Sequence, residues 1–176
     1  AQDVFMKGAN ALDAMGQAGV LLGMENGGTM GKAMGHVMAK GIHFVIPVGL
    51  EKTVIGSVAD DAVEMGIHRL DYCSGMPVGL MPLSGEVITE MEAMEQLAHV
   101  EVFHVAGGGV AGGEGSVALL IKGEKDQVEK IVDLYTLLKK EAEEAPAGGP
   151  ALCADHKWQH CATKNIYYAR NVKEGK

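Results

Sequence analysis

Apolar residues in the first half of this chain follow two patterns. Short apolar runs at residues 4–6 and 43–48 predict strands, and apolar residues at helical spacing predict a helix over residues 31–40. Gly41 is the predicted stop of that helix. The order of strand, glycine turn, helix and strand is typical of a βαβ crossover. We therefore expect an α/β fold with a partial, doubly wound parallel sheet.

Two further elements precede a change of pattern after residues 73–77. Ser57 is the predicted N-cap of a helix over residues 57–65, with Gly66 as its stop, and residues 69–72 could form a short strand. The order that follows is typical of a small ferredoxin-like α+β domain. Its predicted elements are a helix at 87–97, strands at 100–105 and 116–121, and an amphipathic helix at 126–140.

These patterns divide the chain into four parts. An α/β domain is expected over residues 1–76 and the ferredoxin-like domain over 77–140. Residues 141–150 have the composition of a linker, and residues 151–176 form a tail that contains the only tryptophan. Within this tail, residues 165–170 could add an edge strand.

Composition excludes several classes of protein. The net charge of −8 argues against nucleic acid as a partner, and no apolar run reaches the length of a membrane span. Three cysteines without a secretory signal favour a cytoplasmic location. The small second domain and the 11 methionines make a homo-oligomer plausible.

A glycine-rich turn precedes the first predicted helix. The segment Asn26-Gly-Gly-Thr-Met-Gly-Lys32 could direct backbone amides at an anionic ligand, with Gly27, Gly28, Thr29 and Lys32 as ligand-binding residues. It is not a Walker A loop, because Asn26 stands where that motif needs glycine. The other interpretation is that these glycines allow the helix to pack closely on a strand.

The first fifty residues resemble the superfamily of ribose-5-phosphate isomerase A and the CoA-transferases. The matching pattern comprises Lys7-Gly-Ala-Asn-Ala-Leu-Asp13, the glycine turns that follow, and Val45-Ile-Pro-Val-Gly49 before Glu51-Lys52. The segment Pro77-Val-Gly-Leu-Met-Pro82 extends this pattern-level likeness over residues 3 to 140. The resemblance implies that the chain lacks an N-terminal phosphate-binding loop. It also implies a phosphorylated or CoA-linked ligand at a cleft between Gly8 and Lys32.

Few catalytic residues of the isomerases carry over to this sequence. Their two aspartates, lysine and glutamate fall on Asn10, Asp13, Gly23 and Ala33, so only Asp13 survives and isomerase activity itself is not expected. In the CoA-transferases a glutamate in a Ser-Glu-Asn-Gly segment is the nucleophile. Here the similar tetrapeptide carries Glu25. The resemblance therefore implies Asp13 and Glu25 as catalytic candidates, with Gly8 and Asn10 as ligand-binding residues.

The tail contains a second candidate site. Histidines four residues apart share one face of a helix, and flanking thiolates could complete a tetrahedral site for zinc or iron. The candidate ligands are Cys153, His156, His160 and Cys161. The alternative is a short helix that packs Trp158 and the cysteines against the core.

Three functions remain open at this point. The chain could be an enzyme or small-molecule-binding protein of the isomerase and CoA-transferase superfamily. It could be a non-catalytic sensor or an oligomeric scaffold with the same fold. It could also be a metal-binding protein that uses its tail.

Overall fold

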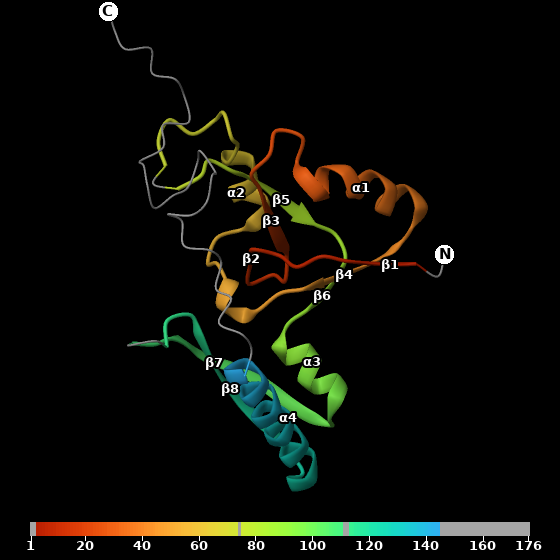
Figure 1. The fold of residues 1–176 in the computed structure, drawn as a ribbon, viewed down its shortest axis with the longest axis vertical. Coiled ribbons are helices and arrows are strands. Elements are labelled where there is room, and N and C mark those ends of the chain that lie inside the picture. Colours follow the sequence, from red (N-terminus) through yellow and green to blue (C-terminus); the bar gives the residue numbers. More distant parts are fainter. Residues whose placement is uncertain (1–2, 74, 111–112, 145–176) are drawn as a thin grey trace, which may run out of the picture.

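The computed structural model describes residues 3–73, 75–110 and 113–144. These residues form a mixed α/β fold with four α-helices, a three-stranded parallel sheet and two antiparallel sheets (Figure 1). The elements in chain order are β1 (Val4–Met6), β2 (Ala11–Leu12), β3 (Ala18–Leu22), α1 (Gly28–Lys40), β4 (His43–Pro47), η1 (Leu50–Lys52), α2 (Val58–Glu64), β5 (Gly79–Leu83), β6 (Glu86–Ile88), α3 (Glu90–Leu97), β7 (Val100–Gly108), β8 (Ser116–Gly123) and α4 (Lys125–Glu144).

The parallel sheet has the strand order β1-β4-β6. In its register Phe5 lies beside Phe44, and the next strand places Val87 beside Ile46. The two phenylalanine rings are 5.2 Å apart between their centroids. Strand β4 is the central strand and pairs in parallel with both neighbours. Ile46 of β4 is accordingly fully buried. The predicted strands at 4–6 and 43–48 are confirmed.

A second sheet, antiparallel and ordered β2-β3-β5, lies beside the first. Strand β3 pairs with β5 along its whole length, from Ala18 opposite Leu83 to Leu22 opposite Gly79. Strands β5 and β6 come from the segment assigned to the second predicted domain. The boundary predicted at residue 77 thus falls before two strands that pair with β3 and β4, and the domain division stays a prediction.

Helix α1 packs against the core through Met30 and Val37, which are 2% and 4% exposed. It ends as predicted, because Gly41 adopts a left-handed conformation at φ 62° and its amide bonds to the Met38 carbonyl. The helix begins at Gly28, three residues before the predicted start. Glycines have no apolar side chain, so a first turn that contains them does not show in the pattern of apolar residues.

Helix α2 confirms its predicted N-cap. The Ser57 side chain accepts a hydrogen bond from the Asp60 amide at 3.2 Å. Val58, the first helical residue, is fully buried and lies against Gly19 of β3. A Cβ at Gly19 would be 2.7 Å from Val58 Cγ1, so this glycine lets the helix approach the strand closely.

One predicted element is absent, and another begins later than expected. Residues 69–72, expected as a possible strand, form a turn and bends without a strand. The helix predicted over 87–97 begins only at Glu90, because the residues before it belong to β6 and pair with β4. Thr89 separates the two elements and is the N-cap of α3. An apolar run too short to show a period cannot distinguish these two structures.

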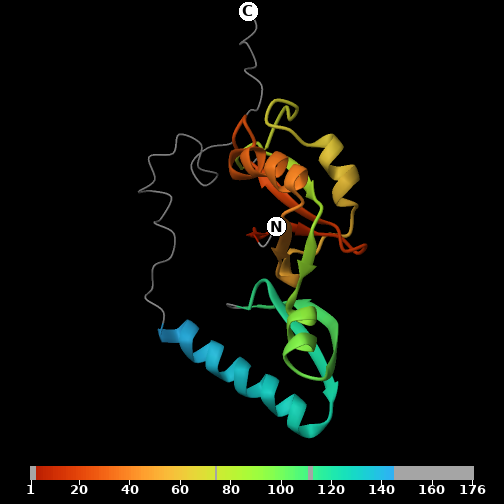
Figure 2. The same ribbon diagram turned by 90° about the vertical axis from the view of Figure 1, so that its right-hand side faces the viewer.

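The remaining elements form a region of their own, which we call the C-terminal region (residues 90–144). Strands β7 and β8 form an antiparallel hairpin, and Figure 2 shows α3 and α4 on one side of it. Val102 and Ile131 are buried where the helices cover the hairpin. The strands predicted at 100–105 and 116–121 and the helix at 126–140 are confirmed, each somewhat longer than expected.

Candidate functional site

The N-cap residue of α1 is a glycine and has no side chain with which to cap the helix. Gly27 and Gly28 both have left-handed conformations, at φ 71° and 57°, and Gly27 is the N-cap residue. The Asn26 side chain accepts the Gly28 amide at 2.9 Å, and the first bond within the helix runs from the Gly31 amide to the Gly27 carbonyl. The first turn contains no acidic side chain. This end of the helix therefore offers its positive dipole to a ligand.

The glycines of this turn also serve a packing role. A Cβ at Gly31 would collide with the Asn26 carbonyl oxygen, and one at Gly27 would lie 2.9 Å from Gly31 Cα. The loop before α1 therefore lies directly on the first turn of the helix. The close approach is therefore between loop and helix and not between helix and strand as expected, and the anion-binding interpretation stays a prediction.

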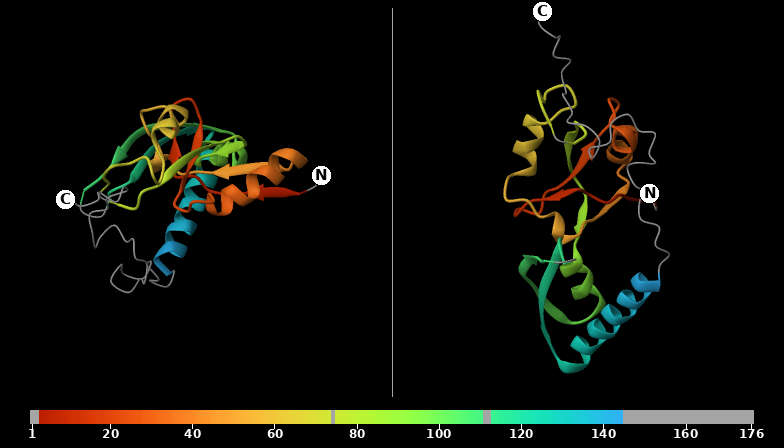
Figure 3. Two further views of the ribbon diagram at one scale, coloured as in Figure 1. Left: turned by 90° about the horizontal axis from the view of Figure 1, so that it is seen from above. Right: turned by 60° about the vertical axis from the view of Figure 1, so that its left-hand side comes forward.

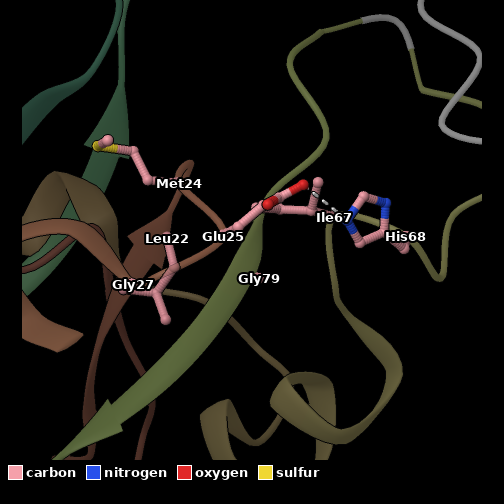
Figure 4. A pocket seen from close by; sticks show the side chains of 7 residues that line it. All are labelled: Leu22, Met24, Glu25, Gly27, Ile67, His68 and Gly79. Atoms are coloured by element: carbon pink, nitrogen blue, oxygen red, sulfur yellow. Dashed lines mark hydrogen bonds and ion pairs between the residues drawn. The ribbon is translucent and has the colours of Figure 1, made fainter.

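A pocket of about 480 Å³ opens beside this turn. Its lining comes from the loop after β3, the loop after α2 and the start of β5 (Figure 4). The lining residues are Leu22, Met24, Glu25, Gly27, Ile67, His68 and Gly79. The turn that precedes α1 and the chain that follows α2 are thus brought together although more than forty residues separate them.

The polar side chains of this pocket form one pair. Glu25 Oε1 lies 3.2 Å from His68 Nε2, and Figure 4 shows the two side chains reaching toward each other. Both are largely exposed, at 81% for Glu25 and 75% for His68. A carboxylate that holds an imidazole in this way can orient the ring, and the ring can donate or accept a proton.

No family model, curated protein or solved structure matches the chain. The resemblance to the isomerases and CoA-transferases therefore stays a prediction. We therefore infer the function of the pocket from its own geometry.

Asp13 has a structural task in this fold. It is 6% exposed, and its carboxylate accepts hydrogen bonds from the amides of Val58, Met15 and Gln17 at 2.9 to 3.0 Å. The bond from the Val58 amide lowers the pKa of Asp13 most, the bond from the Gln17 amide adds to it, and burial opposes the shift. Asp13 joins the turn before β3 to the start of α2. It does not line the pocket, and we leave it out of the proposed site.

The other predicted ligand-binding residues are scattered. The Asn10 side chain accepts the Leu21 amide at 3.0 Å and borders a different pocket, of about 410 Å³, near α2. Gly8 follows β1 and lies near Pro47. Thr29 and Lys32 are exposed on the first turn of α1, outside the lining of the site pocket. Of the predicted residues, Glu25 and Gly27 line the pocket.

The predicted metal site lies outside the described residues. All four candidate ligands, Cys153, His156, His160 and Cys161, belong to the tail. Among residues 3–73, 75–110 and 113–144, no group of three or more histidine, cysteine, aspartate or glutamate side chains could hold a metal ion. Cys73, the one cysteine in this part of the chain, donates its thiol to the Gly75 carbonyl.

Sequence reasoning missed His68. It lies 43 residues beyond Glu25, in a turn after α2, with no motif around it. Glu25 lies between β3 and α1, and His68 lies between α2 and β5. Because β3 and β5 pair, these two connections lie side by side. Pairing of β3 with β5 is the signal that would have found this site, and that pairing joins residues as far apart in sequence as Ala18 and Leu83.

Proposed function

We propose that this chain binds an anionic small molecule in the pocket at the start of α1. The observation that carries the proposal is that the Glu25–His68 pair lines the same pocket as Gly27, the N-cap residue of α1. A helix N-terminus favours negative charge, and left-handed glycines allow a ligand to approach the backbone. The volume of the pocket is within the range typical of small-molecule sites.

The chemistry of the pocket favours a phosphorylated or CoA-linked ligand. The anionic group would lie against the Thr29 and Met30 amides, because Asn26 already accepts the Gly28 amide. The uncharged part of the ligand would rest on the apolar side chains of Leu22 and Ile67, which line the same pocket. His68 would then face the ligand as a proton donor or acceptor, with Glu25 orienting its ring. An enzyme with this arrangement would catalyse proton transfer on a bound phosphate ester or thioester.

We place the chain, as part of this proposal, in the superfamily of the sugar-phosphate isomerases and CoA-transferases. The parallel strands β1 and β4, with α1 between them in sequence, support a partial doubly wound sheet. The order α3, β7, β8, α4 supports the ferredoxin-like arrangement in part, because β6, which precedes α3, pairs with β4 and not with β8.

Titration of the ¹⁵N-labelled chain with inorganic phosphate tests the binding site. We expect saturable shifts of the Thr29 and Met30 amides. Glu25→Gln removes a negative charge from the pocket and is expected to tighten phosphate binding about three- to tenfold. Glu86→Gln is the matched control, because Glu86 pairs with His43 at 2.9 Å outside the lining of this pocket. Unshifted amides, or equal effects of the two substitutions, would overturn the proposal.

The exposure of Glu25 and His68 favours a second candidate, a non-catalytic sensor that uses the same pocket. Native mass spectrometry of the purified full-length chain would identify a retained ligand. With that ligand in hand, His68→Gln separates the two functions. An enzyme would lose turnover while keeping most of its ligand affinity, whereas a sensor would show no turnover before or after the substitution.

A further inference from the structure

The hairpin of β7 and β8 has one closed edge and one open edge. On the β7 side, the Val102 amide donates to Glu95 Oε1 at 3.1 Å and the Val100 amide donates to the Ala98 carbonyl at 2.9 Å. On the β8 side, no further strand pairs with β8 in the part of the chain that the structure describes. The first residues of β7 are therefore protected by α3, whereas β8 has α4 and η1 as neighbours but no strand along its outer edge.

The register of the hairpin fixes which groups face the open edge. The Val102 amide points out of the hairpin, so Val102 and its partner Ile121 form a pair without mutual hydrogen bonds. Such pairs alternate along an antiparallel ladder. His104 and Leu119 are thus the next pair of this kind. The amides and carbonyls of Leu119 and Ile121 consequently face away from β7.

The side chains of β8 do little to discourage pairing at this edge. Residues 117–121 are all apolar and include no proline, and Lys122 is the one charged residue of the strand. Leu119 and Ile121 point into an apolar groove of about 670 Å³ beneath α4. Leu120 lies on the opposite face of the hairpin and is 54% exposed. Natural edge strands usually carry charges, bulges or prolines that block addition of another strand.

We propose that β8 pairs antiparallel with β8 of a second copy of this chain, around a two-fold axis at Leu120. In this register Leu119 lies opposite Ile121 of the second copy, and both keep to the helix-covered face. Lys122 lies opposite Ala118 of the second copy, so like charges do not meet. The outward groups of Leu119 and Ile121 then form the hydrogen-bonded pairs that flank the axis.

This dimer enlarges the sheet of the C-terminal region. A hairpin that packs against helices becomes part of a four-stranded sheet of order β7-β8-β8-β7. Its two edges are the β7 strands, which α3 already closes. The uncovered faces of the two hairpins, which carry Phe103, Leu120 and the Glu101–Lys122 ion pair, become one continuous face. A two-fold arrangement closes on itself and does not propagate.

Charge at Leu120 tests the proposal. Sedimentation velocity should give twice the 18.5 kDa chain mass for the full-length protein. Leu120→Lys and Leu120→Glu each place like charges across the axis and are expected to raise the dissociation constant of the dimer about tenfold or more. An equimolar mixture of the two variants should form dimers again. Val105→Lys is the control, because Val105 is 59% exposed on the other strand of the hairpin.

Hydrogen exchange gives a second measurement that does not depend on mass. The Leu119 and Ile121 amides should exchange slowly in the dimer and rapidly in Leu120→Lys. A monomer at every concentration at which the full-length chain stays dissolved would overturn the proposal, as would a dimer equally sensitive to Val105→Lys. Slow exchange of both amides in a monomer would show that a segment of the same chain occupies the edge, and would overturn it too.

Discussion

The region of residues 4–88 and the C-terminal region differ in how they bury their apolar residues. In the first region, apolar residues from β2, β3, α1, β4 and β5 meet in one core cluster around Met30, Ile46 and Leu83, each at most 2% exposed. In the C-terminal region the described buried apolar residues are few: Ala98, Val102 and Ile131. Figure 3 shows the two regions one above the other in its right-hand view.

Helix α4 shows the consequence most clearly. Ile131 in its first half is 2% exposed, whereas Tyr135, Leu137 and Leu138 in its second half are more than half exposed. In Figure 2 the helix slants away from the hairpin toward its C-terminal end. A helix apolar over so much of its circumference has more surface to bury than one hairpin can cover. The first region holds the larger core, against which Met91, Val117 and Leu119 of the C-terminal region also pack, whereas the C-terminal region leaves much of its own apolar surface exposed.

The largest difference between the regions should appear on truncating a core side chain. Ile46→Ala removes a fully buried side chain from β4 and is expected to lower the free energy of unfolding by about 3 to 4 kcal/mol. Leu137→Ala removes a comparable side chain that is 53% exposed, and about 1 kcal/mol or less is expected. Urea denaturation measures both. Equal losses would contradict the division into a closed core and an open region.

A smaller effect, and a dependence on pH, is expected at Asp13. Its pKa is lowered in the folded chain, chiefly by the Val58 amide, so the ionised carboxylate stabilises the fold above the ordinary aspartate pKa of about 4. That contribution is lost as the pH falls through the lowered value. Asp13→Asn should lower the thermal midpoint at neutral pH, by less than Ile46→Ala does. Its stability should also fall less steeply below pH 4 than that of the wild type, as thermal melts across this range would show.

Local elements of the C-terminal region were predictable from the sequence because their signals are short-range. The strands of the hairpin and the amphipathic period of α4 were found within a few residues of their observed bounds. Ser57 and Gly41 were likewise recognisable as a cap and a stop. Each of these features depends on residues within one or two turns of the chain.

The first region was harder to predict because its sheets depend on distant residues. The sequence AGVLL of β3 has no alternation, and β5 contains a proline, so neither shows a strand pattern by itself. Their pairing is what places Glu25 near His68. The glycine turn was found as a candidate anion site from composition and spacing, but its histidine partner was not. The role of Asp13 was likewise hidden, because the amide of Val58 reaches it across 45 positions.

Two glycines of α1 sharpen the comparison within a single helix. A Cβ at Gly31 meets the Asn26 carbonyl oxygen, whereas one at Gly35 meets nothing within 4 Å. Gly31→Ala should therefore destabilise the chain by about 1 to 2 kcal/mol, because backbone must shift to accept the methyl group. Gly35→Ala should stabilise it by about 0.5 to 1 kcal/mol through helix propensity. Chemical denaturation of both variants checks the opposite signs, and destabilisation by both would show that the loop does not rest on Gly31.

The smallest effect is expected at the junction of the two regions. Thr89 caps α3 by accepting the Met91 amide at 3.1 Å, and Glu92 accepts the Thr89 amide at 2.8 Å in return. Burial of the Glu92 carboxyl raises its pKa, but the hydrogen bonds from the Thr89 side chain and backbone outweigh burial and lower the pKa overall. Thr89→Ala should lower the free energy of unfolding by about 1 kcal/mol.

Thr89→Ser keeps the hydroxyl and should cost clearly less than Thr89→Ala. Because the lowered pKa of Glu92 depends on Thr89, that pKa should move upward in Thr89→Ala, as a ¹³C-detected titration of the Glu92 carboxyl can show. Hydrogen exchange can show which part of the chain loses stability in Thr89→Ala. If the cap holds only α3, faster exchange will be confined to the C-terminal region. If exchange also increases in β4 and β6, the first region relies on this junction and its core is not independent.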